Sequence, residues 1–475
     1  MSERDTIAAP APPLEPIEPE VRTVMDADDR LRPEFVAQVL DAVEAGDNDT
    51  ARALVEPLHP ADVADLIELA AGDEREGLVA ALAGIVDAEV YAELNEHVRE
   101  TLIDEMDASQ VADLAGQLDT DDAVAIIEDL DREEQQAVLS AMEPDDRAAV
   151  EEALTYAEET AGRLMQRDLI AVPEHWTVGK VIDYLRSSDE LATDFWEVFV
   201  VSPNHHPVGT CKLSSILRSP RTARVDAIML REQSLIPVDL DQEEVALRFQ
   251  KYSLISAAVV DPSGRLVGMI TVDDIVHIIQ EEAGEDVLLL SGAGDGDINE
   301  PVIETYKSRV RWLAANLMTA LVASGIIRLF EHSIERLAVL AVLMPIVAGV
   351  GGNAGTQTLA VTVRAIATNQ LTGSNRWRAV GRELRVAFLN GLTIAVLIGF
   401  AVTVVLGSAQ LGAVIAAAML TNIVIAGFAG VLVPLTMERY GADPAVASSV
   451  FVTMITDSMG FLAFLGLATW VGLVP

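Results

Sequence analysis

The sequence predicts a multidomain α-helical membrane protein, in which an acidic cytosolic part precedes five membrane-spanning helices. Three observations predict this class: a split in charge, a short helical repeat in the acidic part, and long apolar stretches toward the carboxyl end. At 475 residues the chain is too long for one compact core, since a domain usually holds roughly 100–200 residues. We expect, in order, a tail, a helical superhelix, an α/β domain pair, a connecting helix and a five-helix transmembrane domain.

The charge of the chain changes sign near residue 306. Residues 1–306 hold 21 Lys and Arg against 68 Asp and Glu, a net charge of −47, whereas residues 307–475 hold 11 against 6, a net charge of +5. The acidic part would repel phosphates, so we expect no nucleic-acid partner. Cys211 is the single cysteine, which excludes an internal disulfide. Residues 1–33 are rich in Pro and Glu and lack the apolar segment of a signal peptide, which predicts a disordered tail.

A period of about 12 residues runs along the acidic part from Leu58 and is clearest at Met106, Leu118, Leu130 and Met142. At each of these four positions an apolar residue is followed by an acid and then by a residue that favours a helix start, as in "MDASQ" and "LDTDD". A helix of about eight residues and a tight turn fill this period. Short helices stack because one alone cannot bury its apolar face. We therefore expect a helical superhelix at residues 34–155.

Residues 156–280 contain the same succession of elements twice. In "FWEVFVVSPNHHPVGTCKLSSIL" and in "LISAAVVDPSGRLVGMITVDDIVHII", two apolar runs flank a Pro/Gly/Ser turn, and the second run leads into a helix. The two units resemble a tandem pair of CBS domains, most clearly at "VVDPSGRLVGMITVDDI". Such pairs generally regulate another part of a protein. The resemblance leaves two alternatives: a pair that binds an adenine nucleotide, and a regulatory scaffold that binds none.

Five apolar stretches from about residue 311 onward are long enough to cross a membrane, which takes roughly 20 residues. If the five helices alternate, their basic flanking residues fall on one side of the membrane, and basic loops stay in the cytosol. We therefore expect a multi-pass protein of the cell inner (plasma) membrane, with a cytosolic amino terminus and the carboxyl terminus outside. The stretches are residues 312–330, 337–361, 384–407, 411–437 and 446–473, and the basic residues are Lys307, Arg309, Arg311, Arg364, Arg376, Arg378, Arg382, Arg385 and Arg439.

The second apolar stretch contains "PIVAGVGGNAGTQ", residues 345–357, which carries Pro345, Asn353, Gln357 and four glycines. Close helix packing through small residues is one interpretation of the glycines. Packing does not explain the two amides, nor Pro345, which frees a backbone carbonyl. Because such groups must face protein or water in a membrane, we favour a hydrated pathway lined by this face of the helix.

Asp457 lies well inside the fifth apolar stretch, "VTMITDSMGFLAFLGLATW". A carboxylate at this depth is costly and normally functional, and no Lys or second acid lies near it in the predicted helices. A cation is the partner we expect, and magnesium is bound through one or two carboxylates while it keeps several waters. One Asp per chain suits a symmetric dimer that presents two carboxylates to one hydrated ion. The alternative is a protonated Asp with a structural role.

The chain resembles the MgtE family of magnesium channels and transporters over nearly its whole length. The specific matches are "RVRWLAANL" (309–317), the glycine-rich segment followed by "VRAIAT" (363–368), "RELRVAFLNG" (382–391) and "GADPAVASSVFVTMITDSMGF" (441–461). The resemblance implies a homodimer in a lipid membrane that takes Mg²⁺ into the cytosol down its electrochemical gradient. It implies that Asp457 selects the ion and that the pore is lined by Gly352, Asn353, Thr356 and Gln357.

The same resemblance implies a gate. A connecting helix at about 282–304, within a segment 281–306 that precedes the transmembrane pore domain at 307–475, plugs the cytosolic mouth of the pore when regulatory Mg²⁺ is bound to acidic residues around it. The matching acids are Asp274, Glu282, Glu285, Asp286 and Asp443. The charge of −47 agrees with this mechanism, because divalent ions would relieve the repulsion. The alternative is an acidic surface that serves solubility.

Some positions depart from the family pattern, and some functional classes fit poorly. His277 stands where an acid is common, Ser449 and Val450 where Asn–Pro is common, and Thr356 where an amide is common. An intramembrane aspartyl protease needs two carboxylates at membrane depth, and the predicted helices offer only Asp457, so we expect no enzyme. An anion channel would favour positive sites. Broader divalent transport, including Co²⁺ and Mn²⁺, is the alternative function, and coupling to protons stays open.

Overall fold

The computed structural model describes residues 24–187, 195–231, 234–292, 299–371, 373–446 and 448–473. The chain divides into two compact units, residues 1–274 and 275–475. Residues 1–23 of the predicted tail lie outside the described residues. The structured part begins before the predicted boundary at residue 34, because Met25 and Leu31 form an antiparallel bridge and Leu31 is buried in the core.

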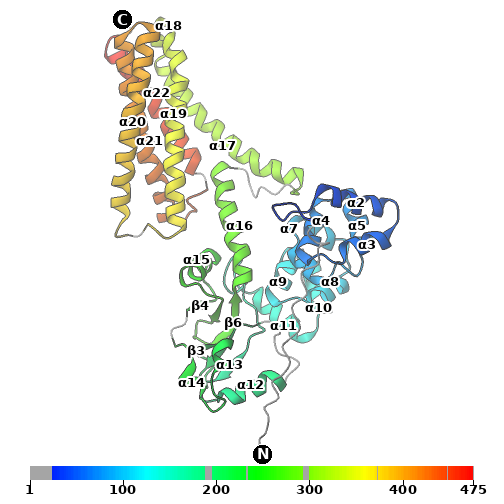
Figure 1. Ribbon diagram of the computed structural model, residues 1–475. Coiled ribbons are helices and arrows are strands. Elements are labelled where there is room, and N and C mark those ends of the chain that lie inside the picture. The colour runs from blue at the N-terminus through cyan, green and yellow to red at the C-terminus, as the bar shows by residue number, and fades with distance from the viewer. Residues whose placement is uncertain are drawn as a thin grey trace, which may run out of the picture. The chain divides into compact units, whose positions relative to one another are not determined.

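Short helices, α2 to α11, build the amino-terminal part of the first unit (Figure 1). The last five begin at residues 96, 108, 120, 132 and 144, which confirms the predicted 12-residue period. The acid of each repeat is the residue before the helix: Asp107 accepts hydrogen bonds from the N–H groups of Ser109 and Gln110, and Asp131 caps α10 in the same way. The helices share one apolar core. They are α2 Pro33–Glu44, α3 Asn48–Val55, α4 Pro60–Leu69, α5 Gly72–Ala81, α6 Ala88–Glu93, α7 Glu96–Ile103, α8 Ala108–Ala115, α9 Thr120–Glu128, α10 Arg132–Ala141 and α11 Pro144–Ala153.

Two three-stranded sheets of the same topology follow, which confirms the predicted α/β pair. In each sheet the first strand pairs parallel with the second, and the second pairs antiparallel with the third. The register shifts at equivalent places, between Val200 and Val201 and between Val259 and Val260. The strands are β1 Ala171–Pro173, β2 Glu197–Val201, β3 Pro207–Lys212, β4 Leu235–Pro237, β5 Ser256–Val260 and β6 Leu266–Thr271; the helices are α12 Val178–Ser187, α13 Leu213–Arg218, α14 Val225–Ile228 and α15 Gln242–Tyr252.

The connecting helix differs from the prediction at both ends. Helix α16 spans Val272–Ser291, so it starts directly after β6 and ends well before residue 304. Gly292 adopts a left-handed φ of +68°, a conformation that favours glycine and ends helices. Pro301 then stands as the N-cap of the next helix. The boundary between the two compact units falls inside α16, after Asp274.

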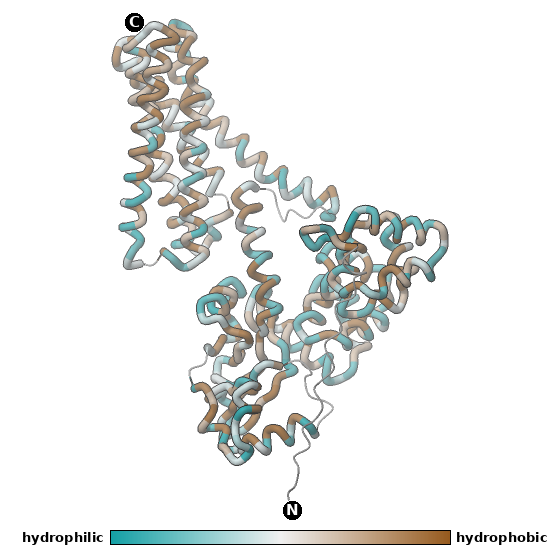
Figure 2. Tube along the Cα trace, viewed as in Figure 1, coloured by the Kyte–Doolittle hydropathy of each residue, from teal (hydrophilic) through white to brown (hydrophobic). Residues whose placement is uncertain are grey.

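Among the described residues, five helices are long and apolar enough to cross a membrane, as predicted. Hydrophobic colouring dominates them in Figure 2. Helix α21 is the most buried of the five and packs against α19, α20 and α22, whereas α17 is the least buried and lies against α22. The predicted loop near residue 331 contains a short helix, α18 Glu331–Arg336. The five are α17 Val302–Leu329, α19 Val339–Ala367, α20 Arg376–Leu406, α21 Ala409–Arg439 and α22 Ser448–Trp470.

The two ends of the helix bundle are marked by polar contacts. At one end, the hydroxyl groups of Ser333 in α18 and Thr469 in α22 lie 3.2 Å apart, and Gln410 Nε2 donates to the backbone carbonyl of Val471 at 3.5 Å. At the other end, Arg376 and Glu438 form an ion pair with a 2.7 Å separation. The loop after α17, the loop before α21 and the end of α22 therefore share one end of the bundle, as an alternating arrangement requires.

Candidate ion pathway and regulatory sites

Two of the four glycines in α19 serve close helix packing. A Cβ atom added to Gly351 would lie 2.0 Å from Asn422 Nδ2 in α21, and one added to Gly355 would lie 2.7 Å from Val452 Cγ1 in α22. Both distances are shorter than real carbon contacts, so only glycine allows the three helices to approach this closely. The packing interpretation therefore holds for this face of α19.

The other two glycines lie on an open face of the same helix. A Cβ atom on Gly349 or Gly352 would meet no atom within 4 Å. Asn353, Thr356 and Gln357 are exposed within the second unit, and Thr356 Oγ1 donates to the carbonyl of Gly352 at 3.0 Å. Two amides and a hydroxyl on an exposed helix face in a membrane must meet protein or water. The sequence alone did not separate this polar face from the packing face.

Asp457 lies near the middle of α22, as its tenth residue. Its side chain is half-buried. Within the part of the chain that the structure describes, the Asp457 carboxylate has no hydrogen bond or ion pair, and no group of three or more His, Cys, Asp or Glu side chains could hold a metal ion. One chain therefore supplies an isolated carboxylate at membrane depth, which leaves its charge to be balanced from elsewhere.

Asn422 is a polar residue of the bundle that the sequence analysis missed. It lies in the middle of α21 and is fully buried. Its Nδ2 donates to the backbone carbonyl of Val347 in α19 at 3.0 Å. The signal was available in "AAAMLTNIVIAGF", residues 416–428, where one amide interrupts an apolar helix.

The end of α16 packs against the bundle end that carries Asp443. An apolar cluster there joins α16 to α19, to the segment before α22 and to α22 itself. Asp443 Oδ1 accepts a hydrogen bond from the N–H of Ala445 at 2.7 Å, which fixes the exposed carboxylate beside this cluster. The cluster consists of Leu359, Val363, Ala445 and Val452, with Leu289 and Leu290 of α16 and Val433 packed against it.

Asp274 lies in the first unit, close to a carboxylate that the sequence analysis did not single out. Gln166 Nε2 donates to Asp274 Oδ2 at 3.4 Å, and the N–H of Thr271 donates to the same atom at 3.3 Å. Burial raises the pKa of Asp274 to about 6. Burial, and then the negative charge of Asp274, raise the pKa of Asp121 in α9 well above its usual value.

Asp121 has one carboxylate oxygen enclosed in protein. Its Oδ1 is buried and has no hydrogen-bond partner among the described residues, although the residue as a whole is partly exposed. Asp122, the next residue, adds a further negative charge that raises the pKa of Asp121. Two buried carboxylates that repel each other are costly when both are ionised. A cation between α9 and the start of α16 would relieve this cost.

The remaining predicted acids lie on α16 in the second unit. Glu282 is half-buried and Glu285 is exposed, three residues further along the helix, so the two share a face. The side chain of Asp286 lies outside the described residues. His277 is exposed. Since Asp274 belongs to the other unit, the gathering of all these acids around regulatory ions stays a prediction.

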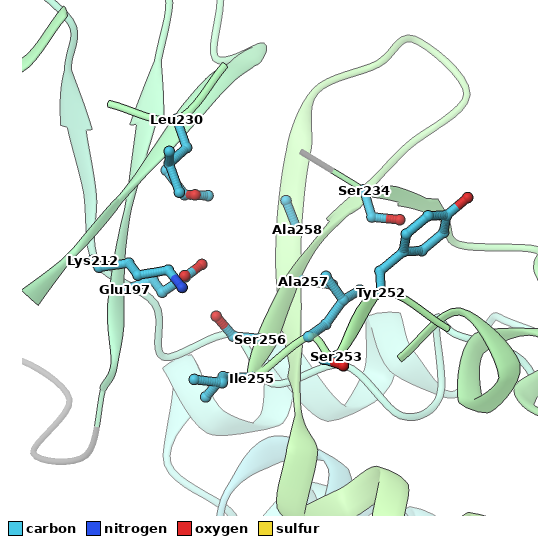
Figure 3. Close-up of a pocket in the computed structure, with 12 residues that line it drawn as sticks. Glu197, Lys212, Leu230, Ser234, Tyr252, Ser253, Ile255, Ser256, Ala257 and Ala258 are labelled. Carbon is cyan, nitrogen blue, oxygen red and sulfur yellow. The ribbon is translucent and has the colours of Figure 1, made fainter. Parts of the chain in front are cut away.

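A small cavity of about 150 Å³ lies between the two sheets of the α/β pair. Glu197 and Lys212 are paired across β2 and β3, and Figure 3 shows their side chains together on the side that faces Ser256. Burial raises the pKa of Glu197, and the charge of Lys212 opposes this effect. A cavity of this volume has room for one aromatic ring, so it could take one ring of a nucleotide base, and the rest of a nucleotide would extend beyond the cavity.

Family comparisons assign three segments of the chain. Residues 344–467 match a family described as divalent cation transporters, residues 58–159 match the MgtE intracellular N domain, and residues 225–281 match the CBS domain. The chain is 32% identical over 320 residues to a protein of Enterococcus faecalis named magnesium transporter MgtE, an alignment that covers 66% of this chain and 70% of the relative. A protein of the same name from Bacillus subtilis is 30% identical over 319 residues, with the same coverage.

Two solved structures are similar to about half of the chain. The soluble part of a magnesium transporter is 25% identical, with a TM-score of 0.46, and the match covers 53% of this chain and 98% of that one. The cytosolic domain of the Mg²⁺ channel MgtE, solved in complex with ATP, is 28% identical, with a TM-score of 0.47 and a coverage of 51% and 99%.

Proposed function

We propose that this chain, which belongs to the MgtE family of magnesium transporters, admits Mg²⁺ into the cytosol through a pore that Asp457 makes selective for this ion. The observation that carries the proposal is the carboxylate of Asp457, halfway along α22, which has no partner among the described residues, in a chain whose α19 exposes two amides and a hydroxyl. The protein is a transporter, like its named relatives, and not an enzyme.

The pore is proposed to lie between two copies of the chain. Asn353 and Thr356 are exposed in a single chain, and water or a second copy must cover them in a membrane. Mg²⁺ dehydrates reluctantly and is usually held by one or two carboxylates with several waters kept. Two Asp457 side chains related by twofold symmetry would balance the charge of one hydrated ion. The open face of α19 would then offer Gln357, Thr356 and backbone carbonyls to its water shell.

The proposed orientation rests on the residues at one end of the bundle, and the electrochemical gradient sets the direction of transport. Basic residues lie at the end of α19, the start of α20 and the end of α21, which predicts that the end of the bundle where these three meet faces the cytosol. Exposed Trp377 and Tyr440 lie at the same ends of α20 and α21, where aromatic side chains favour the membrane interface. The carboxyl terminus would face outward, and Mg²⁺ would enter the cell down its electrochemical gradient across the inner membrane.

The decisive test is the variant Asp457→Asn, which keeps the size of the side chain and removes its charge. We expect Mg²⁺ flux through the purified protein in liposomes to fall by roughly 100-fold, the upper end of the loss seen when a residue that supports a metal site is removed. Ser458→Ala, at the next position of the helix, is the matched control. Normal Mg²⁺ uptake by Asp457→Asn would refute the role of this carboxylate. Parallel flux of Co²⁺ and Mn²⁺ through the wild-type protein tests the broader divalent alternative.

We propose that cytosolic Mg²⁺ closes this pore. Leu289 and Leu290 at the end of α16 pack at the bundle end that carries Asp443, so a shift of α16 would change access to that end. Asp121 and Asp274 store repulsion that a divalent ion would remove, and Glu282 and Glu285 on α16 are further proposed ligands together with Asp286. Several such pairs could bias a two-state gate by a few kcal/mol, enough to change its populations by roughly 10- to 100-fold.

The gate is tested by the response of flux to internal Mg²⁺. Joint neutralisation of the acids at 274, 282, 285 and 286, or deletion of residues 1–280, should leave flux less inhibited by millimolar internal Mg²⁺. Cleavage near residues 292–296, most of which lie outside the described residues, should be faster without Mg²⁺ than with it. Equal protease sensitivity and equal open probability of the wild type with and without Mg²⁺ would show that the acids are only a solvated surface.

For the α/β pair we propose that an adenine nucleotide binds with one ring of its base in the cavity between the sheets. The cavity offers Lys212, the hydroxyl groups of Thr210 and Ser256, and room for a single ring. Binding of ATP to the purified protein, measured by calorimetry, tests the proposal, and Lys212→Ala should weaken it. An unchanged heat signal on addition of ATP to the wild type would favour a scaffold without nucleotide.

A further inference from the structure

Asn422 joins the two helices to which the ion pathway is assigned. Its side chain is fully buried and lies between Gly351 of α19 and Gly460 of α22. Cβ atoms added to these glycines would lie 2.0 Å and 2.6 Å from Asn422 Nδ2. The three nearest atoms to each added Cβ all belong to Asn422. One amide therefore fills the space that two glycines leave open.

Of the two polar atoms of the Asn422 amide, Nδ2 is hydrogen-bonded. Nδ2 donates to the carbonyl of Val347 at 3.0 Å, while Oδ1 is buried without a hydrogen-bond partner among the residues that the structure describes. A buried amide with an unsatisfied oxygen is costly in an apolar environment. An alanine or leucine would avoid that cost, so packing alone does not explain an asparagine here.

The surroundings of Asn422 indicate what it does. Gly460 lies three residues after Asp457 on α22, and Gly351 directly precedes Gly352 on α19. The amide thus touches both pore helices within one turn of proposed pore positions. We infer that Asn422 is a positioning residue, which fixes the spacing of α19 and α22 and thereby the distance at which Asp457 meets a hydrated ion. This inference rests on the proposed function.

The contact itself is tested first, without measuring transport. Gly351→Ala should lower the thermal unfolding temperature of the full-length protein in detergent, because its new methyl group meets Asn422. Adding Asn422→Ala to this variant removes both clashing atoms, Nδ2 and Cγ, and should restore much of the loss. Gly466→Ala, on α22 where an added Cβ meets no atom within 4 Å, is the control for replacing a glycine. If Gly351→Ala is as stable as Gly466→Ala, or Asn422→Ala brings no recovery, the inference is overturned.

The positioning role is tested by selectivity. In liposomes, Asn422→Ala should change the ratio of Mg²⁺ flux to Co²⁺ flux by roughly tenfold, the lower end of the effect of residues that orient metal ligands. A purely structural role would lower both fluxes equally, in proportion to the folded fraction. An unchanged ratio therefore overturns the inference. Failure of the proposed function gives a different result, because the wild-type protein itself would then carry no Mg²⁺. That result would also overturn the selectivity role of Asn422.

Discussion

The variant Asp121→Asn removes one of two half-buried carboxylates of the first unit that repel each other. At pH 7 an ionised Asp274 costs the folded state free energy, because burial raises its pKa from 3.8 to about 6. A rise of about two pH units corresponds to about 3 kcal/mol as an upper limit. Burial is the largest cause of the rise and persists in the variant, and the charges of Asp273 and Asp122, which also raise the pKa of Asp274, persist too. The variant acts through Asp121 itself, whose ionised form is disfavoured by burial and then by the charge of Asp274. Removing this one charge should recover about 1–2 kcal/mol of local stability, a part of that upper limit.

The sign of the pH dependence follows from the raised pKa values. A carboxyl group with a raised folded-state pKa binds its proton more tightly in the folded protein, so its contribution is most favourable below pH 3.8 and is lost as the pH rises to about 6. Without Mg²⁺, the contact between α9 and the start of α16 should therefore weaken between these pH values. Above pH 6 the Asp121→Asn variant should exceed the wild type in stability.

Hydrogen exchange on the full-length protein measures this effect locally. In Mg²⁺-free buffer at pH 7.5, the amides of α9 should exchange about 5- to 30-fold more slowly in Asp121→Asn than in the wild type. Addition of Mg²⁺ should protect the wild type and have a smaller effect on the variant. Asp113→Asn, which removes an exposed acid of α8, should behave as the wild type does. Equal exchange in the wild type and Asp121→Asn, with and without Mg²⁺, would refute the reasoning.

Three further predictions follow from α19 and α16. Gly355→Ala should lower the free energy of unfolding by about 1–3 kcal/mol, because its methyl group would overpack against Val452. Gly352→Ala should leave the unfolding temperature unchanged or higher and should lower Mg²⁺ flux. The reverse result would show that Gly352 lies on the packing face of α19 and Gly355 on the open face. Asn353→Ala should reduce flux or alter selectivity at unchanged thermal stability, and loss of stability with normal flux per folded protein would favour packing. Leu290→Ala should loosen α16 from the bundle and raise flux at millimolar internal Mg²⁺ by about 5- to 30-fold; unchanged inhibition would contradict the plug.

Local patterns accounted for most of the fold. The 12-residue period was visible because each repeat carries its own helix signal, and Asp107 and Asp131 cap helices α8 and α10. The membrane helices were visible because about 20 consecutive apolar residues are a local property. The sequence prediction put the end of α16 too far along the chain, because acidic and apolar residues occur on both sides of Gly292. The helix ends there because this single glycine adopts a left-handed backbone conformation.

The sequence by itself determined the fold class, the five membrane helices and Asp457 as an isolated charge in an apolar helix, because composition and spacing along the chain suffice for each. Only the tertiary structure decided which glycines of α19 pack and which lie open, since that depends on where α21 and α22 approach. It also brought Asp121 toward Asp274 and set Asn422 between Gly351 and Gly460. These pairs lie far apart in the chain, and their energies come from burial and charge that arise only when distant segments meet.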